Sequence, residues 1–213
     1  MGKLRLFENR QEAGKLLAYK LKEQAIEDGW ILALPRGGVV VGFEMAKILK
    51  RPLDVVVVRK IGAPYEPELA IGAVAQGEEV LDAHMASELD PRSLKETIER
   101  EKLELKRREQ LYRGGRPPLD LKAKTAIVVD DGLATGYTAQ AAIKAVKKLH
   151  PSKIIFAAPV CARDSIVRIE HEVSKIVCIL LPHDLQAIGL YFRTFPQVSD
   201  EEVMQLLKKS KQI

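Results

Sequence analysis

One stretch of this sequence carries both a fold signal and a chemical signal, and it reads Ala126-Ile127-Val128-Val129-Asp130-Asp131-Gly132-Leu133-Ala134-Thr135-Gly136-Tyr137-Thr138. Its first four residues are apolar, as in a strand that is buried on both faces of a parallel sheet. Two aspartates follow, and a glycine-containing loop then leads into a helix from about Gly136. Ligands of open α/β sheets bind at the carboxyl ends of the strands. The stretch therefore predicts a parallel sheet with a ligand site at its edge.

The sequence around this stretch alternates short apolar runs with amphipathic segments from about residue 30 to residue 182. Such alternation is typical of an α/β fold in which helices flank a parallel sheet. Helices are expected at about 9–27, 38–50, 92–112, 136–149, 162–172 and 199–210. Strands are expected at Trp30–Leu34, Leu53–Val58, Ala70–Ala75, Thr125–Val129, Lys153–Val160 and Lys175–Leu181, and residues 77–81 resemble the return arm of a hairpin.

Length and composition indicate one soluble globular domain. The chain has 213 residues, of which 46% are hydrophobic and 30% charged, and single domains typically span about 100–200 residues. Its longest apolar runs are far shorter than the roughly 20 residues that cross a bilayer. The first ten residues lack the apolar core of a secretory signal, so a cytoplasmic protein is expected. Cys161 and Cys178 lie in apolar runs and are expected to be buried and reduced.

The loop after the two aspartates has the features of a phosphate site. The start of a helix presents unpaired N–H groups and the positive end of the helix dipole, and Thr135 and Thr138 add hydroxyl donors. The carboxylates of Asp130 and Asp131 cannot bind a phosphate, but they suit sugar hydroxyls or a divalent cation. A ribose 5-phosphate with Mg²⁺ nearby is the expected occupant. No P-loop motif or dinucleotide-binding glycine pattern competes with this interpretation.

The stretch resembles the phosphoribosyl pyrophosphate-binding signature of the type I phosphoribosyltransferases, in which a strand, two acids and a Thr-Gly-x-Thr loop follow one another. The resemblance implies that Asp130 and Asp131 hold the ribose hydroxyls and contact the metal indirectly. It departs from the usual pattern at Tyr137, where many relatives have a small residue, and this ring is expected at the rim of the phosphate pocket. The implied 5-phosphate loop comprises Leu133, Ala134, Thr135, Gly136, Tyr137 and Thr138.

Two further loops fit the same family. In Leu34-Pro35-Arg36-Gly37-Gly38, a glycine pair before a helix lets backbone amides approach an anion, and Arg36 adds a guanidinium. This segment resembles the family's pyrophosphate loop, and Arg59-Lys60 resembles its basic second loop. A plain strand-to-helix turn and two surface cations are the alternatives. The resemblance implies pyrophosphate binding by Arg36, Gly37, Arg59 and Lys60, with Arg36 and Lys60 catalytic beside the acids.

The similarity to one bacterial and archaeal subfamily of phosphoribosyltransferases covers nearly the whole chain. It rests on Pro35–Gly38, Val58–Pro64, Pro67–Val74, Leu111–Pro118 and Phe195–Val203. It does not indicate which base accepts the ribose. In the family a small hood covers the ligand edge of the core, and here we expect a core of about 28–182 with a hood from 1–27 plus 183–213. Tyr191, Phe192 and Phe195 either stack on the base or pack the core of this hood.

A long charged segment interrupts the regular order of elements. Residues 92–116 contain nine basic residues and five glutamates. They are expected to form a solvated helix with pairs such as Glu96–Arg100 and Glu104–Arg108, although a phosphate-facing or partner-facing role is the alternative. The basic residues at its end have few acids near them in the sequence, and we expect this cluster to support the active site or a partner subunit of a homo-oligomer, such as a dimer. The cluster comprises Arg107, Arg108, Arg113 and Arg116.

The function that the resemblance implies is Mg²⁺-dependent transfer of a phosphoribosyl group from phosphoribosyl pyrophosphate to a nitrogenous base, which releases pyrophosphate and gives a nucleotide. A mobile segment should keep water out, and the loop Gly62–Glu68 and the end of the charged helix at Tyr112-Arg113 are both candidates. Two alternatives remain open: a sensor of the donor that binds nucleic acid through the basic helix, and a diphosphokinase-like or hydrolytic enzyme. Interleaved charges favour the transferase, so nucleic-acid binding is not expected.

Overall fold

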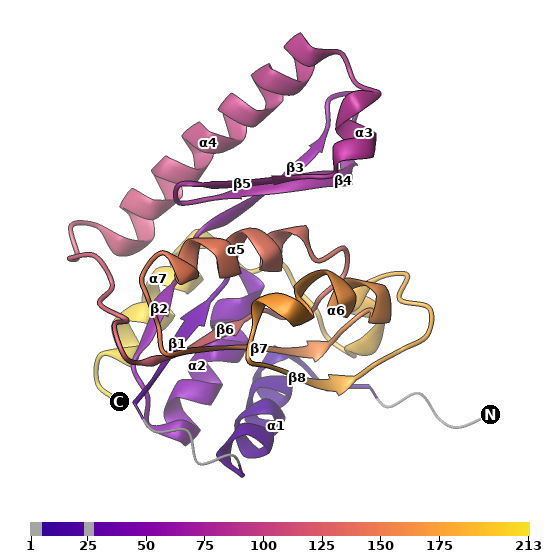
Figure 1. The fold of residues 1–213 in the computed structure, drawn as a ribbon. Helices are drawn as coiled ribbons and strands as arrows, with labels where there is room; N and C mark the ends of the chain where they lie inside the picture. The colour runs from indigo at the N-terminus through magenta and orange to yellow at the C-terminus, as the bar shows by residue number, and fades with distance from the viewer. Residues whose placement is uncertain (1–5, 24–27) are drawn as a thin grey trace.

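The computed structural model describes residues 6–23 and 28–213, and a five-stranded parallel sheet forms its centre (Figure 1). The strands lie in the order β2-β1-β6-β7-β8. The chain therefore crosses from β1 to β2 on one side and adds β6, β7 and β8 on the other. The predicted α/β class with a parallel sheet is confirmed. The strands span Gly29–Ala33 (β1), Leu53–Val55 (β2), Thr125–Val129 (β6), Lys153–Val160 (β7) and Lys175–Leu180 (β8).

Three helices cover one face of this sheet: α1 (Arg10–Lys22), α2 (Gly37–Leu49) and α7 (Asp200–Ser210). Alternate residues of a strand point to opposite faces, and Ile31 and Ile127 pack on this side with Leu17 of α1 and Val203 of α7. Helices α1 and α7, which we expected in the hood, therefore form a layer of the core. The predicted helix 9–27 ends at Lys22, and residues 1–5 and 24–27, also assigned to the hood, lie outside the described residues.

Helix α5 (Tyr137–Lys147) lies between the opposite face of this sheet and a second, smaller sheet (Figure 1). Its Ile143 belongs to the same core cluster as Val128 of the parallel sheet and Val80 of the second sheet. Helix α6 (Arg163–Ile169) and the short helix η1 (Glu170–Glu172) connect β7 to β8. No helix in the described part of the chain is both long enough and apolar enough to cross a membrane.

The second sheet is antiparallel and belongs to a unit, residues 58–113, that is inserted between β2 and β6. It contains β3 (Val58–Ala63), β4 (Glu66–Ala75), β5 (Glu78–Leu81), α3 (Ala83–Ser87) and α4 (Pro91–Arg113). The hairpin expected at 77–81 is confirmed. The strand predicted at Leu53–Val58 is wrong in extent, because a continuous run of valines covers the end of β2, the connection to this unit and the start of β3.

Helix α4 is the predicted charged helix, and it packs on β3 of the inserted unit (Figure 1). Its apolar side buries Ile98, Leu105 and Tyr112. The predicted Glu104–Arg108 pair forms at 2.7 Å. Glu96 pairs with Arg92, at 3.1 Å, so the pair expected with Arg100 is wrong. Cys161 and Cys178 are buried free thiols, as predicted.

Candidate functional site

The two loops that the sequence analysis singled out meet at the carboxyl ends of adjacent strands. Ala33 of β1 pairs with Val129 of β6, and the Leu34 amide donates to the Val129 carbonyl at 2.8 Å. Gly37 then lies directly against Asp131, because a Cβ added at Gly37 would overlap the Asp131 carboxylate. The meeting point lies where the order of strands reverses, between β1 and β6. This is the position at which open α/β sheets bind ligands.

The two aspartates have different environments. An Oδ1 atom of Asp130 accepts a 2.8 Å hydrogen bond from the Asp131 amide. Burial raises the pKa of Asp130 well above its usual range, and the charge of Asp131 raises it further. Asp131 is instead held by a cation, because its Oδ2 atom accepts from Nε of Arg10 at 2.7 Å. The end of β6 therefore carries two different acids: Asp130 has a raised pKa, and Asp131 is paired with the Arg10 cation.

Arg10 is a site residue that the sequence analysis missed. It is the first residue of α1, and Nη1 donates to the Pro196 carbonyl at 2.7 Å. Its guanidinium lies 3.5 Å from the centroid of the Phe195 ring, in the range of a cation–π contact. The only local signal is a cation at the start of a helix, where the helix dipole disfavours positive charge. That placement indicates an acidic partner but does not identify Asp131, which is 121 residues away.

The predicted 5-phosphate loop has the backbone of an anion site. Leu133 is fixed by a 2.8 Å bond from its amide to the Val160 carbonyl. Gly136 adopts a left-handed conformation with φ of 83° at the N-cap of α5, and no side chain caps the helix. The first amides of α5 have no acceptor within the helix. Ala134 and Thr135 are exposed and Thr138 is half-buried, so the loop is accessible to a phosphate.

Tyr137 does not lie at the rim of this loop, as the sequence analysis expected. Its hydroxyl donates to Oδ2 of Asp82 at 2.6 Å, and the guanidinium of Arg168 lies 4.0 Å from its ring centroid. The ring is buried in the core cluster between the two sheets. Arg168 also donates to the Thr135 carbonyl at 3.1 Å. The interior between the two sheets accommodates the large Tyr137 side chain. Tyr137 therefore connects the phosphate loop to the inserted unit.

Arg36 of the predicted pyrophosphate loop precedes α2 and faces Asp200 at the start of α7, at 3.8 Å. The same carboxylate accepts from the Tyr112 hydroxyl at 2.5 Å and from Arg107 at 3.2 Å. The end of α4 thus reaches the candidate site through Asp200. These contacts also correct the expectation that the terminal cluster of α4 has few acids near it. Glu104 of the same helix pairs with Arg107 and Arg108, and the other acids come from distant segments. Arg113 and Arg116 of the cluster both pair with Asp54 of β2, at 3.3 Å and 3.7 Å.

Arg59 and Lys60 do not lie in a loop beside the acid pair. Both are within β3, and among the described contacts none joins them to Asp130, Asp131 or Arg36. Arg59 pairs with Glu101 of α4 at 2.7 Å, and Lys60 pairs with Glu68 of β4 at 3.4 Å. The expected position is wrong because the chain leaves the parallel sheet after Val55 and forms a strand of the inserted unit.

The three aromatic residues of the predicted hood pack in one apolar cluster that also contains Phe7. The Phe192 ring lies 5.2 Å from that of Phe7 and 4.7 Å from that of Phe195. Tyr191 and Phe192 are buried in this cluster, so the packing alternative holds for them and base stacking does not. Phe195 is half-buried and supports Arg10.

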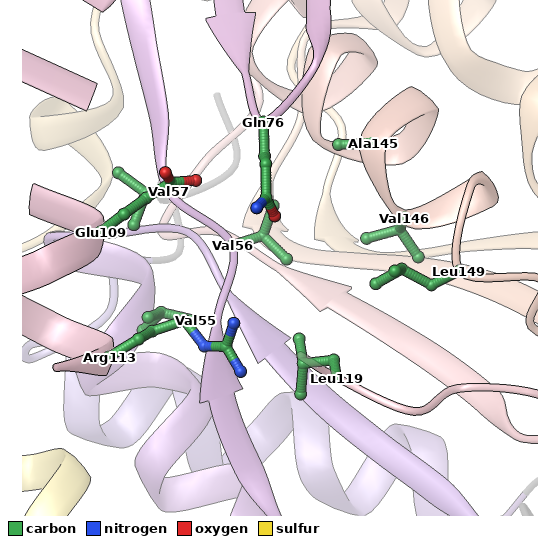
Figure 2. Close-up of a pocket in the computed structure, with 10 residues that line it drawn as sticks. All are labelled: Val55, Val56, Val57, Gln76, Glu109, Arg113, Leu119, Ala145, Val146 and Leu149. Carbon is green, nitrogen blue, oxygen red and sulfur yellow. The ribbon is translucent and has the colours of Figure 1, made fainter. Parts of the chain in front are cut away.

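The cavity drawn in Figure 2 lies between the inserted unit and α5, and none of the residues predicted to bind the donor or the base lines it. Its volume is about 30 Å³, enough for about one water molecule. Glu109 and Arg113 of α4 line it together with Gln76 and the Val55–Val57 connection. Burial raises the pKa of Glu109. The cavity separates two packed layers and is too small for a nucleotide.

A comparison with protein families agrees with this geometry. Residues 6–192 match the model of the phosphoribosyl transferase domain. The chain belongs to the phosphoribosyltransferase family. In a crystal structure, protein TT1426 of Thermus thermophilus is similar to this phosphoribosyltransferase with a TM-score of 0.79 and 38% identity, covering 96% of this chain and 98% of that one. The hypoxanthine phosphoribosyltransferase of Staphylococcus aureus shares the fold, with a TM-score of 0.50 at 12% identity, over 86% of this chain and 79% of that one.

Similar sequences are found in two strains of Mycobacterium tuberculosis. The protein named "Putative phosphoribosyl transferase Rv0571c" is 39% identical over 210 residues, which is 97% of this chain. The chain spans about half the length of that relative, 47%. The similarity thus covers the phosphoribosyltransferase domain described here.

Proposed function

We propose that this phosphoribosyltransferase moves the phosphoribosyl group of phosphoribosyl pyrophosphate to a nitrogenous base, which releases pyrophosphate and gives a nucleotide. One observation carries the proposal. The acid pair Asp130–Asp131 and the Arg36–Gly37 loop lie in contact where the strand order reverses, and the uncapped start of α5 follows the acids directly. This edge of the sheet thus offers suitable binding groups for the sugar, the leaving group and the 5-phosphate. Such an enzyme serves nucleotide metabolism, and we propose a cytoplasmic homo-oligomer.

Each part of the site has a separate task in this proposal. The amides at the start of α5 bind the 5-phosphate, and Asp130 and Asp131 hold the ribose hydroxyls. Arg36 and the Gly37 amide bind the pyrophosphate. As the bond to the leaving group breaks, negative charge builds on pyrophosphate and positive charge on the ribose ring. Donors fixed at the pyrophosphate and the Asp131 carboxylate fixed near the ribose ring lower the barrier, because these groups need no reorganisation.

The donor set fits Mg²⁺ that is held largely by the substrate. Asp130 and Asp131 supply two carboxyl groups, and the described residues contain no group of three or more His, Cys, Asp or Glu side chains that could hold a metal. Mg²⁺ commonly binds one or two carboxylates together with substrate phosphates and waters. When bound, the ion would neutralise charge that develops on the pyrophosphate. We propose that the aspartates contact it through ribose hydroxyls or water.

The hairpin between β3 and β4 is the better candidate for the cover that keeps water out. The alternative, the end of α4, is fixed because Tyr112 is buried and bonded to Asp200. In the hairpin, Tyr65 is 82% exposed and residues 66–69 of β4 are exposed. Exposed hairpins can close over a substrate and exclude water. Closure would also be the way for Lys60 of this hairpin to reach the pyrophosphate.

A screen of nucleobases tests the proposal. Each base is mixed with phosphoribosyl pyrophosphate, Mg²⁺ and enzyme, and pyrophosphate release and nucleotide formation are measured. At least one base should give a nucleotide, and Asp130→Asn and Asp131→Asn should lower its turnover by at least about 100-fold with circular dichroism unchanged. Near wild-type turnover for both variants, or no nucleotide from any base, would contradict the proposal.

A further inference from the structure

The geometry points to Arg10 as a positioning residue for Asp131: its bond to Oδ2 and its stacking on Phe195 fix the carboxylate so that Oδ1 receives a ribose hydroxyl of the donor. This inference rests on the proposed function and names a residue outside the family signature. Arg10 lies in α1, far from the signature in sequence. Its effect on the substrate passes through Asp131.

One carboxylate oxygen of Asp131 already has a partner in the protein. Oδ2 accepts from Nε of Arg10 at 2.7 Å, and it also lies against Gly37. Within the described part of the chain, no N–H or hydroxyl group donates to Oδ1. The Asp131 side chain is 17% exposed. A ligand that bonds this carboxylate therefore approaches Oδ1.

Arg10 itself is held from three directions. Nε contacts Asp131, Nη1 donates to the Pro196 carbonyl at 2.7 Å, and the plane of the group lies over Phe195. Only a planar guanidinium can make two directed bonds and a stacked contact at once. Its side chain is 9% exposed. A group fixed in this way limits the rotation of the carboxylate that it holds.

Arg10 also connects the proposed ribose site to the C-terminal segment. Thr194 and Arg193 bond to residues just before α1, through Thr194 Oγ1 to the Glu8 carbonyl at 2.6 Å and Arg193 Nε to Glu8 Oε1 at 3.0 Å. The segment that supports Phe195 is thus fixed next to the start of α1. Through its bonds to Pro196 and Asp131, Arg10 connects this joint between residues 193–196 and the start of α1 to the carboxyl end of β6.

Calorimetry with three ligands tests the inference. We compare wild type, Arg10→Met and Arg10→Lys for ribose 5-phosphate, phosphoribosyl pyrophosphate and pyrophosphate, all with Mg²⁺. Arg10→Met should weaken both ribose ligands by about tenfold, the effect of one lost hydrogen bond, and leave pyrophosphate unchanged. Arg10→Lys keeps the charge but not the stacking, so it should fall between. Arg193→Met is the matched control, because it removes a guanidinium–carboxylate pair from the same joint without touching Asp131.

A double-mutant cycle separates positioning from a general loosening of the joint. If Arg10 acts through Asp131, Arg10→Met should have no further effect in an Asp131→Asn background. Equal losses in both backgrounds, a loss of pyrophosphate binding, or an equal loss in Arg193→Met would overturn the inference. If Arg10→Met does not fold, Arg10→Lys carries the same cycle. Wild type that binds no ribose ligand would overturn the proposed function and this inference with it, whereas wild-type binding with an unaffected Arg10→Met overturns only the inference.

Discussion

Arg36 is the residue whose contribution can be separated most clearly from that of its neighbours. Its guanidinium lies at the pyrophosphate loop, and the Asp200 carboxylate holds it at 3.8 Å. Arg36→Ala should weaken phosphoribosyl pyrophosphate and pyrophosphate, but it should spare ribose 5-phosphate, which lacks the leaving group. Charge-assisted bonds of this type contribute about 1.5–3 kcal/mol, so the loss should be about tenfold to a hundredfold.

Isothermal titration calorimetry measures the three affinities. Arg92→Ala is the control, because Arg92 lies at the far end of α4 and pairs only with Glu96 among the described contacts. Equal losses for pyrophosphate and ribose 5-phosphate in Arg36→Ala would place Arg36 elsewhere in the mechanism.

The sequence was sufficient to predict those site residues that directly follow a predicted strand. Asp130, Asp131, Arg36 and Gly37 follow strands at one edge, and strand order alone brings them together. Arg10 could not be predicted in the same way, because its partner and its stacking ring are both distant in sequence. The local pattern, a cation at the start of a helix, indicates an acidic partner but cannot identify one so distant in the chain.

Helix α4 is the element with the clearest dependence on pH. The pKa of Glu104 is lowered from 4.5 to about 2, chiefly by a hydrogen bond from Arg107. Burial opposes this shift, and a hydrogen bond from Arg108 lowers the pKa further. A carboxyl whose pKa is lowered by folding stabilises the native state above its unfolded pKa, and this contribution is lost as pH falls through the folded value. The stabilisation from Glu104 should therefore be complete above about pH 4.5 and disappear toward pH 2.

Glu104→Gln tests this directly in urea unfolding. The variant should lose about 1 kcal/mol of unfolding free energy at pH 7, since solvent screening limits partly exposed pairs to that size. The difference from wild type should shrink as the pH is lowered from 4.5 toward 2. Glu96→Gln, in an exposed pair of the same helix, should show a smaller difference. A Glu104→Gln effect that stays constant with pH would show that the pair is not the cause.

Elements differ in how well they could be predicted. The bounds of β6 and β7 agree with the prediction to the residue, because each is an apolar run that begins and ends sharply. Strand β3 was missed because Val55–Val58 is apolar throughout, and no breaker marks the place where the chain changes sheet. Helices α1 and α7 were predicted as helices, but their packing on the parallel sheet depends on contacts that the local pattern does not contain.

For the whole molecule, the distribution of charge argues against a regulator that binds nucleic acid. The net charge is +5, but the terminal cluster of α4 is paired, since Arg107 contacts Glu104 and Asp200 and Arg108 contacts Glu104. Paired arginines would have to exchange their carboxylates for phosphates. We expect no salt-sensitive binding of duplex or single-stranded nucleic acid at micromolar protein, as measured by fluorescence anisotropy. Tight binding that falls steeply between about 50 and 200 mM salt, and disappears in Arg107→Ser/Arg108→Ser, would favour the sensor.

The central claim is that the edge between β1 and β6 binds phosphoribosyl pyrophosphate through Asp130 and Asp131. Calorimetric titration of the donor with Mg²⁺ into wild type and into Asp130→Asn/Asp131→Asn tests it most directly, because no acceptor base has to be known. Wild type should bind with a dissociation constant between about 1 µM and 1 mM, the usual range for enzyme substrates, and the folded double variant should bind at least about tenfold more weakly. Absence of binding to wild type, or equal affinity in the double variant, would contradict the account.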